Sequence, residues 1–147
     1  MGCVKRLLIA VAVLVVVAVS FFVARWINND TTERARVTQL LRAQARGDAG
    51  QMLRILRCPD AACEALVRTN ARRLKGRGDL KVALYQTRTG HALTSRTGPV
   101  RVVWFTPGRL TTVQCVLVRR EGNAFAGMTV SLLRLSAPIA RESSCPG

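Results

Sequence analysis

Residues 80–87 read LKVALYQT, and at this stretch the spacing of the apolar residues changes from helical to alternating. Before it, apolar residues recur at intervals of three and four. After it, runs rich in Val alternate with short turn sequences. The first pattern indicates amphipathic helices and the second indicates half-buried strands. Helices followed by strands along one chain are typical of an α+β fold. We therefore expect two or three helices packed on a curved antiparallel sheet of about four strands.

The first of these helices is expected at about 31–46, after a polar linker at 28–33. Asp30 and Glu33 stand at the spacing of a capping box, in which a short polar side chain caps a helix and an acid three residues later caps it in return. Gly47 then supplies the αL residue that commonly ends a helix. This pattern predicts a helix start near Asp30.

Two further helices are expected before the sheet. Asp48 is suited to be the N-cap of a helix at about 49–57. Pro59 cannot continue that helix, so a third one is expected from Asp60 to about Leu74. Together with the first helix they would cover one face of the sheet.

Four strands are expected, separated by residues that favour turns. They cover residues 80–87, 99–106, 110–120 and 124–135, with a short extension at 92–94. The turns are expected at 89–91, 107–108 and 121–123. The helix residues Val37, Leu40 and Leu41 should then face strand residues such as Val102, Trp104, Val116 and Val130.

An apolar run near the N-terminus predicts a membrane anchor. Residues 7–24 read LLIAVAVLVVVAVSFFVA, 18 residues without a charge. At 1.5 Å per residue a helix of that length spans roughly 27 Å, close to the hydrocarbon thickness of a bilayer. Trp26 suits the membrane interface. We expect a short cytoplasmic tail at 1–6, a transmembrane helix or signal anchor at 7–26 that contacts the lipid bilayer, and an extracytoplasmic domain at 27–147.

A cleaved signal peptide is the alternative to an anchor. Ala18-Val19-Ser20 resembles a small-x-small cleavage site, and cleavage there would give a secreted protein. Phe21 and Phe22 continue the apolar run beyond that site, which favours an uncleaved anchor. The flanking arginines on the C-terminal side would by themselves place the domain inside, but that rule weakens for long translocated domains. We expect a single-pass protein of the cell membrane whose domain faces the periplasm or the cell exterior.

The cysteines support the extracytoplasmic location. Cys3 lies before the apolar run, and the other four lie in the domain. A short loop separates Cys58 from Cys63, and Cys145 in the polar tail is best explained as a staple for Cys115. We therefore expect the disulfides Cys58–Cys63 and Cys115–Cys145, which form in an oxidising compartment. Four free thiols in a reducing cytoplasm are the alternative, and a redox role is less suited to the CxxxxC spacing.

The chain is strongly basic, with a formal net charge of +15. Without Lys5, Arg6 and Arg25, 20 basic residues remain against 8 acidic ones. Such a charge attracts anionic partners, although an Arg-rich composition alone would produce it too. Arg119 and Arg120 are the candidate contact for an anionic surface or partner protein, with a solvated hairpin tip as the alternative. Nucleic acid is not an expected partner, because aromatic residues do not interleave with the basic ones.

The sequence contains no motif for catalysis, a metal or a cofactor. HExxH, GxSxG, GxxxxGK[ST] and GxGxxG after a strand are all missing. His91 is the single histidine and has no partner at ligand spacing. We therefore name no catalytic, cofactor or metal residues and expect that the protein is not an enzyme.

The order of elements and the Gly47-Asp48 break resemble the cystatin-like or nuclear-transport-factor-2-like fold, over residues 30 to 136. Members of that fold place a helix pair across a strongly bent sheet, and many anchored bacterial members bind small ligands or serve in assembly. With no catalytic motif in the sequence, we expect a non-enzymatic, membrane-anchored binding or assembly module that faces the extracytoplasmic side. The alternatives are a small-ligand enzyme of the same fold, or a basic adaptor for anionic lipid, wall polymer or nucleic acid. The isomerases of that fold pair an acidic base with a buried tyrosine, whereas Tyr85 has no carboxylate in the strands that would face it.

Overall fold

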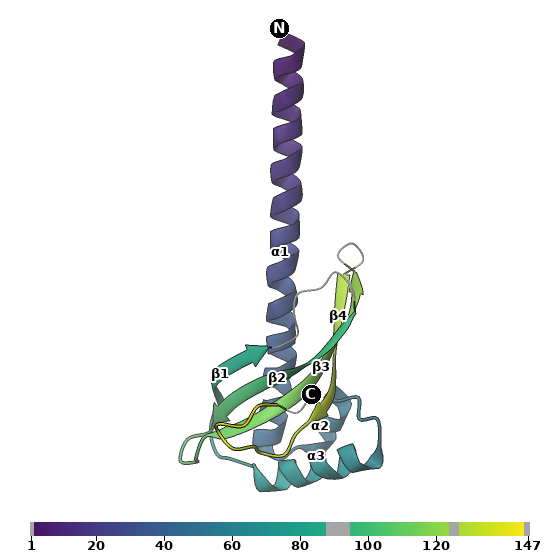
Figure 1. The fold of residues 1–147 in the computed structure, drawn as a ribbon. Coiled ribbons are helices and arrows are strands. Elements are labelled where there is room, and N and C mark those ends of the chain that lie inside the picture. Colours follow the sequence, from purple (N-terminus) through teal and green to yellow (C-terminus); the bar gives the residue numbers. More distant parts are fainter. Residues whose placement is uncertain (1, 88–94, 124–126, 146–147) are drawn as a thin grey trace. The chain divides into compact units, whose positions relative to one another are not determined.

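The computed structural model describes residues 2–87, 95–123 and 127–145. The described part is α+β, as predicted, and its strands form one open antiparallel sheet in the order β1-β2-β3-β4. The helices are α1 (Gly2–Arg46), α2 (Ala49–Ile55) and α3 (Ala61–Arg73) (Figure 1). The strands are β1 (Lys81–Thr87), β2 (Arg96–Phe105), β3 (Thr112–Asn123) and β4 (Gly127–Leu135). The chain divides into two compact units, Met1–Thr32 and Glu33–Gly147.

The first unit contains the apolar part of α1. Residues Arg6–Ala24 form a 19-residue stretch with a mean hydropathy of 3.2, and none of it is buried. By length and composition this stretch can cross a bilayer. It fits a membrane anchor or a signal sequence.

The predicted helix start near Asp30 is wrong. Helix α1 continues from Gly2 to Arg46, and its backbone is helical throughout the expected linker at 28–33. That linker contains no Gly or Pro, the two residues that most disfavour a helix. The helical segments before and after it therefore join into one continuous helix. Capping-box spacing is a local pattern, and Glu33 has a different, long-range role described below.

The caps of the second and third helices are as predicted. Gly47 has a φ of +77°, the αL conformation that ends α1. The Oδ1 atom of Asp48 accepts a hydrogen bond from the backbone N of Gln51 at 2.8 Å, and Oδ1 of Asp60 accepts one from the backbone N of Cys63 at 2.7 Å. Both are N-cap bonds that satisfy a free donor of the first turn.

Helix α2 ends earlier than predicted, because the chain leaves it to join the sheet. Leu56 is extended, with a φ of −85° and a ψ of 133°, and forms a parallel bridge with Leu132 of β4. The backbone N of Arg57 then donates to the Leu132 carbonyl at 2.8 Å.

The predicted hairpin loop at 121–123 is also wrong. Those residues belong to β3, where Glu121 pairs with Thr129 of β4. The connection between β3 and β4 at 124–126 lies outside the described residues. So do the expected turn at 89–91, which includes His91, and the short strand at 92–94. The outer strand pairings contain register shifts at Val82/Leu84 and Leu117/Val118, and such bulges bend a sheet.

The core lies between the helices and one face of the sheet, as predicted. Alternate residues of β2 point into it, which is the two-residue period of a half-buried strand. The residues predicted to face one another lie in one buried cluster, and Val130 is partly buried against it. The cluster includes Val37, Leu40, Leu41, Val102, Trp104 and Val116. Side chains therefore fill this face of the sheet.

Candidate anion-binding cleft

The predicted pair Arg119 and Arg120 does not form a joint surface patch. Neighbouring residues of a strand point to opposite faces of the sheet, and these two do so in β3. Arg120 is only 5% exposed, and its Nε donates to Oε2 of Glu33 at 2.6 Å. Arg119 is exposed and lies 2.8 Å from Glu121, measured from Nε to Oε1. Arg120 is therefore buried in an ion pair, and of the two arginines only Arg119 is exposed.

Glu33 lies at the centre of a buried polar cluster. Its Oε2 accepts from Arg120, and its Oε1 accepts from Oη of Tyr85 at 2.7 Å. The guanidinium carbon of Arg34 lies 5.7 Å from the centre of the Tyr85 ring. A carboxylate thus does face Tyr85, from α1 and not from a strand. Since both carboxylate oxygens are occupied by donors, the cluster joins α1 to β1 and β3 within the second unit.

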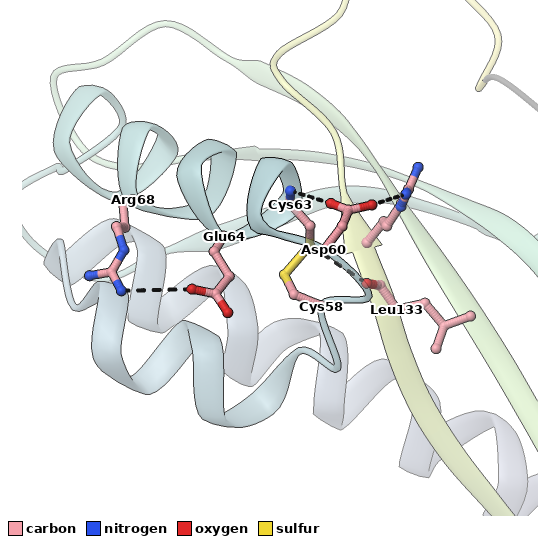
Figure 2. Close-up of a disulfide and its surroundings, with 7 residues drawn as sticks. Cys58, Asp60, Cys63, Glu64, Arg68 and Leu133 are labelled. Atoms are coloured by element: carbon pink, nitrogen blue, oxygen red, sulfur yellow. Dashed lines mark hydrogen bonds and ion pairs between the residues drawn. A yellow bond between two sulfur atoms is a disulfide. The ribbon is translucent and has the colours of Figure 1, made fainter.

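The four domain cysteines are paired as predicted. Cys58 and Cys63 are joined with an S–S distance of 2.02 Å, between the end of α2 and the first turn of α3. Figure 2 shows Asp60 between them in the chain, with one carboxylate oxygen on the backbone N of Cys63. Its other oxygen, Oδ2, lies 2.6 Å from Nη2 of Arg134 on β4. The loop between Cys58 and Cys63 is therefore closed by the disulfide and also bound to β4 by the Asp60–Arg134 ion pair.

The second disulfide holds the C-terminal tail against β3. Cys115 and Cys145 are joined with an S–S distance of 2.07 Å. Ser136 adds two hydrogen bonds to the same place: its N donates to the Cys115 carbonyl at 2.8 Å, and its Oγ accepts from the Cys115 N at 2.9 Å. Disulfides persist in oxidising compartments, so both bonds indicate an extracytoplasmic location.

A basic cleft lies at the end of the sheet where β1 begins and β2 ends. It has a volume of about 590 Å³. Its walls come from the end of α3 with the loop that follows, and from the turn between β2 and β3, which Figure 1 shows at the same end of the sheet. The lining residues are Arg72, Lys75, Gly76, Arg77, Pro107, Gly108 and Arg109. Four of these are cations, and no acidic residue is among the described residues that line the cleft.

Close backbone packing holds the two walls together. A Cβ added to Gly76 would lie 2.2 Å from Oγ1 of Thr106, so only glycine fits there without a shift. One added to Gly78, whose φ is +81°, would lie 3.3 Å from the Pro107 ring. The backbone N of Gly76 also donates to the Ala45 carbonyl at 2.9 Å. The loop is thus seated on both the turn and α1, which gives the cleft a defined shape before any ligand arrives.

Arg109 bridges the two walls. Its Nη1 donates to the backbone carbonyl of Arg73 at 3.1 Å, at the C-terminal end of α3 where helix carbonyls lack partners within the helix. Its own backbone N donates to the Thr106 carbonyl at 3.1 Å, which closes the turn. Arg109 also lines the cleft that these two bonds help to shape.

A second, less polar pocket of about 360 Å³ adjoins the cleft and shares Gly108 and Arg109 with it. Leu74, Trp104 and Leu110 supply its apolar lining, with Thr106 and Thr112 beside them. The indole Nε1 of Trp104 donates to Oε1 of Gln114 at 2.9 Å, so the donor of that ring is already used in the core. Thr106 is 1% exposed, and within the described part of the chain its Oγ1 has no hydrogen-bond partner.

The chemistry of the cleft suits an anion. Guanidinium groups match the geometry of carboxylate and phosphate, and hydrogen bonds between ionised groups are the stronger kind. Among the residues that the structure describes, no group of three or more His, Cys, Asp or Glu side chains could hold a metal ion. The residues named as lining the cleft are thus basic or uncharged.

Reasoning from the sequence missed the cleft, since its cations are spread from residue 72 to residue 109. One signal was present: both Gly76-Arg77 and Gly108-Arg109 are turn sequences. In an antiparallel meander, the start of one strand and the end of the next meet at one end of the sheet, as Lys81 and Phe105 do here. That order brings the two turns together.

No family model, curated protein or solved structure matches the chain. The resemblance to the cystatin-like or nuclear-transport-factor-2-like fold therefore stays a prediction.

Proposed function

We propose that this protein is a single-pass, membrane-anchored module that presents the basic cleft on the extracytoplasmic side and binds an anionic ligand there without turnover. One observation carries the proposal: Arg72, Lys75, Arg77 and Arg109 line a single cavity without an acidic residue among them. Like charges gathered in one cavity repel each other, so a counter-anion stabilises the arrangement.

Two features support the location. The apolar stretch Arg6–Ala24 can cross a bilayer, and the disulfides Cys58–Cys63 and Cys115–Cys145 suit an oxidising compartment. An uncleaved stretch would keep the domain attached to the membrane, where its positive charge would attract anionic headgroups and wall polymers.

An enzymatic role would be expected to use Glu33 and Tyr85, the acid and the tyrosine that lie in contact. Both oxygens of Glu33 already accept hydrogen bonds, and its side chain is 1% exposed. A general base needs a free lone pair within reach of its substrate. The occupied carboxylate supports a structural role, and we propose a binding function on that basis.

Calorimetric titration of pyrophosphate into the full-length chain, held in nanodiscs of uncharged lipid, tests the proposal. The double variant Arg72→Gln/Arg77→Gln should bind at least about tenfold more weakly, since each charge-assisted hydrogen bond contributes about 1.5–3 kcal/mol. Binding should also weaken steeply as salt rises past ~0.15 M, where the Debye length is about 8 Å.

The matched control is Arg36→Gln/Arg42→Gln, two exposed arginines of α1 that carry the same total charge. This control should change affinity by less than about twofold, because neither arginine lines the cleft and salt screens exposed charges. Equal losses in the two double variants would mean that pyrophosphate responds only to net charge, and the cleft would not be a site.

A further inference from the structure

We infer that the ligand of the cleft is a small amphiphilic phosphate ester, whose phosphate lies among the four cations and whose hydrocarbon part enters the adjoining pocket. This inference rests on the proposed function and names the ligand class of the same site. It is carried by the contact between a basic cavity and an apolar one, which share Gly108 and Arg109.

The basic side selects a compact, multiply charged oxyanion. Arg72, Lys75, Arg77 and Arg109 supply four positive charges around about 590 Å³. A phosphate monoester carries up to two negative charges and three terminal oxygens, so it can accept from several of these donors at once. A carboxylate offers one charge and two oxygens, and it would leave more of the cluster uncompensated.

The apolar side requires a hydrocarbon group on that phosphate. Leu110 is 89% exposed and is the most exposed large apolar side chain of the described part of the second unit. It lines the pocket with Leu74 and Trp104, whose indole N–H is already bonded to Gln114. A purely ionic ligand would leave the exposed side chain of Leu110 in water, whereas an alkyl or aryl group would cover it.

Thr106 marks the junction between the two cavities. Thr106 lines the apolar pocket, and its side chain packs against Gly76, which lines the basic cleft. The hydroxyl is buried and, among the described residues, unpartnered. A buried hydroxyl without a partner is costly. The ester oxygen that links phosphate to hydrocarbon would accept its hydrogen bond at this position.

The size of the apolar pocket favours a single small molecule over a bilayer surface. A volume of about 360 Å³ lies in the range of small-molecule sites, roughly 300–1,000 Å³. We therefore assign the site to a soluble ester and treat a membrane headgroup as an outcome that would overturn the inference.

Calorimetry on the full-length chain in nanodiscs of uncharged lipid tests this with inorganic phosphate and n-butyl phosphate as probes. Each buried methylene contributes about a fourfold gain, so butyl phosphate should bind at least about tenfold more tightly than phosphate. Titration into empty nanodiscs corrects for partitioning of the probe into lipid. Leu110→Ser should remove most of the gain for butyl phosphate while leaving phosphate binding unchanged. Leu84→Ser, at an apolar residue of β1 that is 40% exposed and lies outside both cavities, should alter neither.

Thr106→Val removes the hydroxyl and keeps the shape, and it should lower the affinity for butyl phosphate about threefold or more. Thr106→Ser keeps the hydroxyl and should bind butyl phosphate as tightly as the wild type.

The outcomes separate the inference from the proposed function. Equal affinities for phosphate and butyl phosphate would overturn the amphiphilic ligand. If Arg72→Gln/Arg77→Gln still abolished phosphate binding, the proposed anion-binding module would remain. Cleft-dependent binding to phosphatidylglycerol nanodiscs without any gain for butyl phosphate would assign the site to a lipid surface. If phosphate, butyl phosphate and pyrophosphate all failed to bind, the proposed function itself would be overturned.

Discussion

Arg120 of β3 donates from Nε to Oε2 of Glu33 on α1 at 2.6 Å, across 87 positions of sequence, and almost nothing of either side chain reaches solvent. Tyr85 of β1 completes the contact through Oη at 2.7 Å. One carboxylate therefore fastens the helix to two different strands of the sheet. A buried charge is tolerable only when it is paired in this way.

Removal of one partner of this ion pair should be strongly destabilising. Arg120→Met should lower the free energy of unfolding by about 3–5 kcal/mol, because Glu33 is left buried without its cation. The double variant Glu33→Leu/Arg120→Met should recover much of that loss, since no uncompensated charge remains. Urea unfolding of the full-length chain in micelles, followed by circular dichroism, measures both.

The exposed ion pair of Arg134 with Asp60 is the control for this experiment. Both side chains are about half exposed, so Arg134→Met should cost no more than about 1 kcal/mol. A loss of similar size at Arg120 and at Arg134 would contradict a special role for the buried pair.

The two disulfides should differ in what they contribute. In the chain-entropy model, Cys115–Cys145 closes a loop of 30 residues and contributes about 3–4 kcal/mol, whereas Cys58–Cys63 spans five and contributes about 2 kcal/mol. The paired replacements by Ser should therefore lower the melting temperature more for the tail bond. Non-reducing peptide mapping of protein from its native membrane checks the pairing first. Four free thiols there would reject both bonds and the oxidising compartment.

Gly76 should tolerate no side chain. Gly76→Ala places a Cβ 2.2 Å from Oγ1 of Thr106, and relief of that overlap should cost about 1–3 kcal/mol. Gly50 in α2 is the matched control, because the nearest atom to its added Cβ is 3.5 Å away and helical Gly→Ala gains up to about 1 kcal/mol. If the Gly76 variant is as stable as the Gly50 variant, the loop is not seated on the turn as described.

The domain should be exported and should remain attached to the membrane. A reporter that works only after export should be active when fused at Gly147, and a reporter restricted to the cytoplasm should be inactive there. Intact mass of the purified protein should retain residues 7–24 as part of the chain. A mature chain that starts near Phe21 would make the protein secreted, and an active cytoplasmic reporter would reverse the orientation.

Local turn chemistry was enough to predict most of the fold. Gly47, Asp48 and Asp60 ended and started helices where expected, because a φ above zero and a side-chain acceptor are properties of single positions. The change to a two-residue period marked the sheet, and the predicted core residues are buried together. The same local reasoning failed at Glu33, whose partners lie 52 and 87 positions away.

Long-range placement also explains what was missed in the candidate site. Arg119 and Arg120 are adjacent in sequence, but the alternation of a strand sends one outward and the other toward the core. Val116 and Val118 share the parity of Arg120 and are buried, so the alternation itself contained that signal. The cleft is different, because Arg72 and Arg109 are far apart in sequence. They line one cavity only because the loop after α3 and the turn after β2 lie at the same end of the sheet. A local sequence pattern cannot predict that proximity.

The strand order and the spacing of the cysteines suggest the order in which the sheet and the disulfides form. Each strand lies beside the strand that precedes it in the chain, so the sheet can grow by one edge at a time as synthesis proceeds. Cys58 and Cys63 are five positions apart and can be oxidised before any strand has emerged. Cys115 must wait as a thiol for another 30 residues, until β4 and the tail are available. We therefore expect the tail disulfide to form after the Cys58–Cys63 disulfide.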